Sequence, residues 1–154
     1  MDTSRLAEEI AASVRDKGST VAVAESLTAG RLSAALGAAS GAGDWFRGGV
    51  VAYSTQVKRA VLGMPDCSPV CEEAAVAMAR GVRELMGADI AVAVTGVGGP
   101  DKQDGEPVGS VWFAVATQAG VRPLHLHFDG DAPEIVDATV DHGLELLLDS
   151  VRGS

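Results

Sequence analysis

Three side chains in this sequence have the types and surroundings needed for nucleophilic catalysis by a serine. Ser26 follows a short apolar run and precedes an expected helix, so the backbone N–H groups of residues 27–30 can stabilise an oxyanion. A serine hydroxyl is a weak nucleophile until a base removes its proton, and a buried lysine can be that base, a role open to Lys58. Tyr53 can relay a proton or orient that lysine. Together they predict nucleophilic catalysis, against the simpler interpretation of Ser26 or Thr28 as a helix cap.

Histidine offers a poorer partner for the serine. His125 and His127 lie in an expected β-hairpin, and His142 lies in the last expected helix. These positions place all three rings away from Ser26, which disfavours a Ser-His-Asp triad.

A glycine-rich segment, residues 95–100 (TGVGGP), allows the backbone to approach a ligand closely. It lacks the Gly-Lys-Ser/Thr ending of a phosphate-binding P-loop, and no helix clearly follows it. Beside the other two segments, it is best interpreted as a wall that binds ribose, phosphate or an amide.

The elements that must position these residues follow from the hydrophobic pattern. Apolar runs predict strands at residues 20–24, 49–53 and 89–95, and a hairpin at 109–117 and 121–128. Helical spacing predicts helices over 3–17, from 28, from 55, over 71–86 and over 132–148, with a loop at 37–43. This order predicts one domain, residues 1–154, with an α/β fold. We expect a three-layer α/β/α sandwich around a mixed, mainly parallel five-stranded sheet.

Three of the expected strands end in polar segments of small residues: 25–30, 53–58 and 95–99. In open α/β sheets, ligands bind beyond the carboxyl ends of the parallel strands. Because all three segments can lie at that edge, the sequence predicts one site there.

Composition excludes several kinds of partner. The chain has 12 basic and 21 acidic residues, a net charge of −9, and no basic cluster, which disfavours binding to DNA or RNA. Aromatic residues make up 4%, too few for a surface that stacks bases. No segment has the length of a membrane span, and the N-terminus is unlike a signal peptide. We expect a cytoplasmic protein that binds a small molecule and neither nucleic acid nor membrane.

The two cysteines, Cys67 and Cys71, lack the second pair of Cys or His that would complete a four-ligand metal set. We therefore expect no metal and two reduced thiols.

Several segments, in this order, resemble the CinA C-terminal family, the nicotinamide-nucleotide amidases. They are residues 24–30 (AESLTAG), 49–58 (GVVAYSTQVK), 94–100 (VTGVGGP), 107–114 (PVGSVWFA) and 128–131 (FDGD). The resemblance covers roughly residues 5–150.

The resemblance implies hydrolysis of the carboxamide of nicotinamide mononucleotide to nicotinate mononucleotide and ammonia, without cofactor or metal, by a homo-oligomer. It places the catalytic groups on Ser26, Tyr53 and Lys58. Substrate contacts are expected from the serine turn and the segments after the other two strands: Glu25, Thr28, Ala29, Gly30, Ser54, Thr95, Gly96, Gly98 and Gly99.

The chain departs from the family pattern in two places. Leu27 and Ala29 replace a cysteine and a glycine in the serine turn, and Ala132 and Val136 replace two arginines. Arg31 or Arg122 are candidates to replace the missing charge. The departures keep open an alternative, a catalytically silent paralogue that binds a nucleotide or a protein partner.

Overall fold

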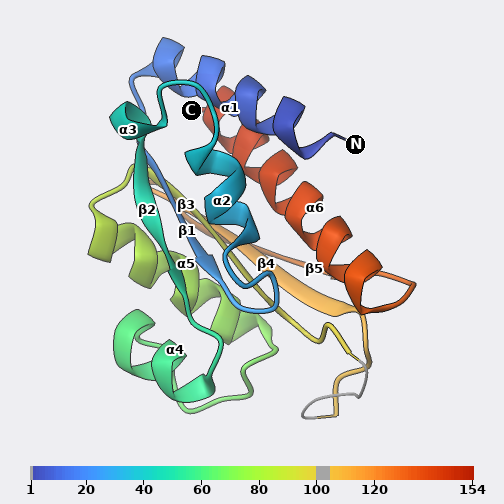
Figure 1. Ribbon diagram of the computed structural model, residues 1–154. Helices are drawn as coiled ribbons and strands as arrows, with labels where there is room; N and C mark the ends of the chain where they lie inside the picture. Colours follow the sequence, from blue (N-terminus) through green and yellow to red (C-terminus); the bar gives the residue numbers. More distant parts are fainter. Residues whose placement is uncertain (1, 100–104) are drawn as a thin grey trace.

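The computed structural model describes residues 2–99 and 105–154, which form a five-stranded sheet between two layers of helices (Figure 1). Pro100, the last residue of the glycine-rich motif, lies outside the described residues. The elements, in chain order, are α1 (Thr3–Lys17), β1 (Val21–Glu25), α2 (Arg31–Gly37), α3 (Ala42–Trp45), β2 (Phe46–Val51), α4 (Thr55–Leu62), α5 (Glu72–Met86), β3 (Ile90–Gly96), β4 (Ser110–Thr117), β5 (Gly120–His127) and α6 (Ala132–Arg152).

The sheet is mixed, with strand order β2-β1-β3-β4-β5. Strand β1 pairs in parallel with β2 on one side and with β3 on the other. Strand β4 is antiparallel to β3, and β5 returns from it as the expected hairpin. The predicted three-layer α/β/α sandwich with a mixed, mainly parallel sheet is confirmed.

The two faces of the sheet carry side chains of different size. Valines and a phenylalanine face the layer formed by α1, α2 and α6, whereas alanines face α5. Since successive strand residues point to opposite faces, the alternation in β1, Val21-Ala22-Val23-Ala24, separates the two sizes. The alanine face lets α5 pack closely on the sheet, as the aliphatic, alanine-rich composition indicated.

Some predicted boundaries are wrong. Strand β2 runs over Phe46–Val51 rather than 49–53, so Tyr53 lies beyond its end. Its sequence, FRGGVV, contains two glycines, which weaken the strand signal, and Gly48 has a φ of 138°. The expected loop at 37–43 already contains the start of helix α3. Helix α2 begins at Arg31 rather than near residue 28.

Within the part of the chain that the structure describes, no helix combines the length and apolarity needed to cross a membrane.

Candidate functional site

The carboxyl ends of β1, β2 and β3 meet around a small cavity of about 200 Å³. Residues from all three predicted segments line it, and the first turns of α6 close one side. The lining residues are Ser26, Leu27, Tyr53, Lys58, Gly96, Val97, Gly98, Gly99, Ala132 and Val136. The structure therefore brings the predicted serine, tyrosine and lysine together. Sequence reasoning did not single out Val97, although it lies within the predicted glycine-rich wall.

Lys58 reaches the cavity from α4 and is almost completely buried, with 3% of its surface exposed. Its Nζ donates a hydrogen bond to Thr95 Oγ1 at 3.2 Å, and that hydroxyl donates in turn to the carbonyl of Pro69 at 2.5 Å. The position of the amine is thus set by the end of β3 and by the segment before α5. Thr95, expected to contact substrate, is fully buried and contacts this lysine instead.

Tyr53 lies at the mouth of the cavity, and 71% of its surface is exposed. It follows the end of β2 and precedes Ser54, whose hydroxyl accepts a hydrogen bond from Val57 N and so caps α4. Ser54, another expected substrate contact, therefore orients the helix that carries Lys58.

Glu25 organises the turn that carries Ser26. Its carboxylate is fully buried and accepts four hydrogen bonds, from Thr28 Oγ1 at 2.6 Å, Leu32 N at 2.9 Å, Ser33 N at 2.9 Å and Ser33 Oγ at 2.7 Å. A buried carboxylate satisfied in this way belongs to the scaffold. Glu25 and Thr28 were expected to contact substrate, but neither lines the cavity, and Ser26 beside them remains 6% exposed.

Residues Ala29 and Gly30 complete this turn with positive φ angles of 47° and 99°. Glycine adopts such angles without strain, whereas an alanine there costs about 1 kcal/mol or more. The turn holds Ala29 in this conformation partly because its N–H donates to the carbonyl of Ser26 at 3.1 Å. Both residues were expected substrate contacts, but Ala29 is exposed, Gly30 is half-buried, and neither lines the cavity.

The expected oxyanion donors, the N–H groups of residues 27–30, are only partly suited to that role. The Ala29 N–H donates to the turn, and the first free N–H groups of α2 donate to Glu25. Leu27 is the residue of this group that lines the cavity, together with Gly98 and Gly99 from the opposite wall.

A close approach of β2 to α2 depends on Gly49. A Cβ at this position would overlap Ser33 Oγ, one of the donors to Glu25, and would lie 2.8 Å from Val23 Cγ2. The glycine therefore lets Ser33 reach the carboxylate that orders the serine turn.

We expect Gly49→Ala to lower the free energy of unfolding by about 1–3 kcal/mol, the range measured for overpacked cores. Urea unfolding followed by circular dichroism measures it. Gly37→Ala is the matched control, because a Cβ there meets no atom within 4 Å at the end of α2. Equal stability of Gly49→Ala and the parent protein would contradict the close packing described here.

The histidines lie outside the cavity lining. His125 stacks on Trp112, with ring centroids 4.5 Å apart, and its Nε2 lies 2.7 Å from Ser110 Oγ. The same hydroxyl donates to Glu106 Oε2 at 3.2 Å. Sequence reasoning missed this serine–histidine pair, which the antiparallel pairing of β4 and β5 brings together. Ser110 is 1% exposed, and the carboxylate contacts the serine rather than the imidazole, so the arrangement differs from a catalytic triad.

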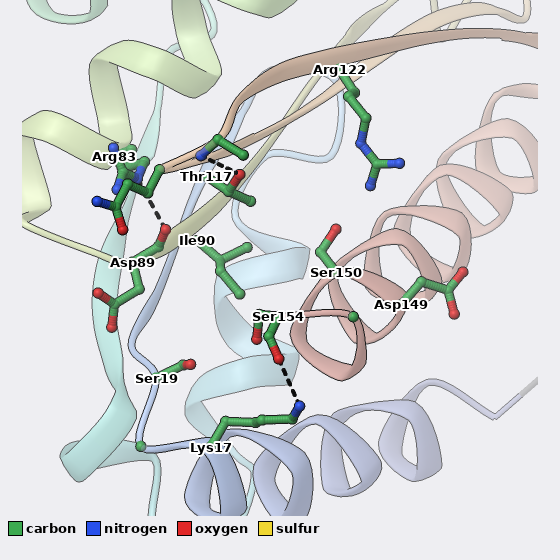
Figure 2. A pocket seen from close by; sticks show the side chains of 14 residues that line it. Lys17, Ser19, Arg83, Asp89, Ile90, Thr117, Arg122, Asp149, Ser150 and Ser154 are labelled. Carbon is green, nitrogen blue, oxygen red and sulfur yellow. Dashed lines mark hydrogen bonds between the residues drawn. The ribbon is translucent and has the colours of Figure 1, made fainter.

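A second, larger groove of about 1050 Å³ lies at the opposite end of the sheet, where β1 and β3 begin (Figure 2). Arg122 extends over it, far from the strand ends that carry Ser26, so it cannot supply a charge there. Lys17 Nζ donates to a Ser154 carbonyl oxygen, and Arg83 Nε donates to the Asp89 carbonyl. The lining also includes two acidic side chains, Asp89 and Asp149.

Arg31, the other candidate cation, begins α2 and forms an ion pair with Asp137 at 2.7 Å. Asp137 follows Val136, which lines the cavity, whereas Arg31 itself is outside the lining. About half of its side chain is exposed.

Comparison with known proteins identifies the family of the chain. The family model of the CinA C-terminal domain matches residues 3–151. A crystal structure of a CinA superfamily protein from Klebsiella pneumoniae superposes with a TM-score of 0.95 at 32% identity and covers 100% of both chains. A second structure, of the competence damage-inducible protein A from Klebsiella pneumoniae, has a TM-score of 0.92 at 35% identity and covers 97% of this chain and 96% of that one.

Curated relatives are longer. A relative from Desulforamulus reducens is 38% identical over 157 residues, covering 99% of this chain and 38% of its own length. The CinA-like protein of Frankia casuarinae is 38% identical over 142 residues, covering 89% of this chain and 33% of its own length. The chain thus spans between 33% and 38% of the length of these relatives. On the match to nearly its whole length, the chain belongs to the CinA C-terminal domain family.

Proposed function

We propose that this protein is an amidohydrolase that converts nicotinamide mononucleotide to nicotinate mononucleotide and ammonia. The observation that carries the proposal is that a buried serine and a buried lysine, Ser26 and Lys58, line one cavity at the strand ends. The substrate comes from the resemblance of the ordered motifs to nicotinamide-nucleotide amidases. The proposal includes action in the cytoplasm, as a homo-oligomer, on a small molecule rather than on nucleic acid or membrane.

In the first half of the proposed reaction, Ser26 Oγ attacks the carboxamide carbon while its proton passes to Lys58 Nζ. Base catalysis by this lysine needs the neutral amine. The N–H group of Leu27 and those of the facing glycines are the candidate donors to the oxyanion. When the tetrahedral intermediate collapses, the proton passes from Lys58 through Tyr53 to the leaving nitrogen. The C–N bond breaks, ammonia leaves, and Ser26 remains as an acyl-serine ester.

In the second half, a water molecule attacks the ester carbon and gives its proton to Lys58. Collapse of this second intermediate breaks the ester bond, returns the proton to Ser26 Oγ and releases the nicotinate carboxyl group. The serine and the lysine thus end in their starting states.

The size of the cavity supports an orientation for the substrate. Its 200 Å³ is below the roughly 300–1,000 Å³ of pockets that bury whole drug-sized ligands. We therefore infer that the cavity takes the carboxamide end, while the ribose phosphate extends over the rim. Ala132 and Val136 form part of this rim and carry no charge, which leaves Arg31, paired with the Asp137 that follows Val136, as the candidate for the phosphate.

We expect Arg31→Ala to raise KM for nicotinamide mononucleotide by up to about tenfold, because the variant loses one exposed charge-assisted hydrogen bond to the substrate phosphate. KM for nicotinamide riboside, which lacks the phosphate, should stay unchanged and is the matched control. Steady-state kinetics on both compounds measure the difference. An equal rise for both substrates would place the phosphate elsewhere.

The proposal is tested by measuring ammonia release when the purified protein is incubated with nicotinamide mononucleotide. Release that depends on enzyme concentration supports it. The uncharged rim at Ala132 and Val136 favours a second candidate, a silent paralogue that binds a nucleotide or a protein partner. A folded protein that binds the mononucleotide in calorimetry and releases no ammonia would support this second candidate instead.

A further inference from the structure

The two cysteines lie in contact just before helix α5, outside the cavity lining. Their sulfur atoms are 3.6 Å apart, and both residues are partly exposed. A disulfide bond needs the sulfurs at about 2.05 Å, so closing one requires a side-chain movement of an ångström or two.

The environments of the two thiols differ. Cys71 occupies the N-cap of α5, where its Sγ accepts a hydrogen bond from Ala74 N at 3.4 Å and its thiol donates one to the Ser68 carbonyl at 3.1 Å. The pKa of Cys67 is raised to about 11, mainly by burial. The hydrogen bond with Cys71 and the negative charges of Cys71 and Glu73 also raise it, whereas the positive charge of Arg59 lowers it. Because the raised pKa makes Cys67 the weaker nucleophile at neutral pH, we expect Cys71 to be the sulfur that reacts first.

We propose that Cys67 and Cys71 form a reversible redox site that closes to an intramolecular disulfide by exchange with a low-molecular-weight disulfide such as glutathione disulfide. The Cys71 thiolate attacks one sulfur of the small disulfide, whose S–S bond breaks, and one glutathione thiolate leaves. Cys67 then loses its proton and attacks Cys71 Sγ in the mixed disulfide, which expels the second glutathione. Two protein thiols are oxidised, and one glutathione disulfide is reduced to two glutathione molecules.

The first step prepares the second. In the mixed disulfide Cys71 carries neither a negative charge nor a thiol proton, so two of the causes that raise the pKa of Cys67 disappear. The resolving thiol then ionises more readily, which favours ring closure over a persistent mixed disulfide.

The site is coupled to the cavity through the short segment between the cysteines. Pro69 lies in this segment, and its carbonyl accepts the hydrogen bond from Thr95 Oγ1, which itself receives the hydrogen bond from Lys58 Nζ. Closing the disulfide moves the segment on both sides of Pro69, so the position of Lys58 changes with the redox state.

The test uses the full chain, incubated with excess glutathione disulfide at neutral pH and analysed by intact mass and thiol titration. We expect the protein to lose two hydrogen atoms and both titratable thiols, and dithiothreitol to restore both. Cys67→Ser should stop at one bound glutathionyl group, because the resolving thiol is absent. Cys71→Ser should react more slowly, because burial, the largest cause of the raised pKa of Cys67, persists after the contributions of Cys71 are removed.

Either of two outcomes would overturn the inference. One is a wild-type protein that keeps both thiols under conditions that modify Cys67→Ser. The other is a wild-type protein that stops at the glutathionyl adduct. These readouts do not depend on enzyme activity.

A second arm rests on the proposed function. If the protein releases ammonia from nicotinamide mononucleotide, oxidation should lower kcat severalfold in the wild type and leave kcat of the Cys67→Ser/Cys71→Ser double variant unchanged. An unchanged kcat in the oxidised wild type would remove the coupling to Lys58 while the thiol data still stand. Absence of amidase activity in the reduced protein would count against the proposed function alone.

Discussion

Replacing Ser26 with alanine is expected to lower ammonia release from nicotinamide mononucleotide by at least about 1,000-fold, because the covalent route is lost with the nucleophile. Ser26 is 6% exposed, and the strand ends bring it into one cavity with Lys58. Alanine removes a single oxygen and leaves the buried network of Glu25 in place. The loss should therefore appear in kcat, with little change in the binding of the mononucleotide.

Ser110→Ala is the matched control for this variant. Ser110 is also a buried serine at a strand terminus, and it contacts His125, the partner that a conventional serine hydrolase would use. We expect its kcat to stay within a few-fold of the wild-type value. If Ser110→Ala were the inactive variant and Ser26→Ala remained active, the nucleophile assigned here would be wrong.

The second large effect is expected from Lys58→Met, which should lower kcat by about 100- to 10,000-fold, the usual contribution of a general base. Methionine keeps much of the buried side-chain volume and removes the amine. Thr95 Oγ1 keeps its hydrogen bond to the Pro69 carbonyl, so this buried hydroxyl at the end of β3 still has a hydrogen-bond partner. Thermal unfolding of the variant checks that the fold persists.

The variant Lys58→Arg distinguishes a role of Lys58 as a base from a role of its positive charge. Arginine keeps a positive charge but does not deprotonate in proteins, so a base role predicts that this variant is as inactive as Lys58→Met. Lys17→Met serves as the control at a lysine whose amine contacts Ser154 at the opposite end of the sheet. Substantial activity in Lys58→Arg would show that the lysine acts through its charge, and the mechanism proposed here would have to be replaced.

The pattern of apolar residues was sufficient to predict the main elements. Helices α1 and α5 have apolar positions at helical spacing and clear ends, where Gly18 and Gly87 adopt left-handed conformations. Strand β3 is a continuous apolar run with all seven residues buried. Strand β2 was misplaced because two glycines interrupt it, and an edge strand is defined by pairing with its neighbour more than by its own sequence.

For the site, the sequence by itself determined which residue types follow the three parallel strands, and chain order placed them at one edge of the sheet. That was sufficient to select Ser26, Tyr53 and Lys58, which line the cavity. Judged by residue type and position in the sequence, Glu25 and Thr95 were equally good candidates to contact the substrate.

Only the tertiary structure decided that these two side chains serve the scaffold. Glu25 points toward α2 because alternate residues of β1 face that layer, and its carboxylate must be satisfied once it is buried. Thr95 faces the other layer, where Lys58 arrives from α4. Long-range packing decides which face of the sheet a strand residue points to and which helix covers that face. Short sequence motifs do not contain this information.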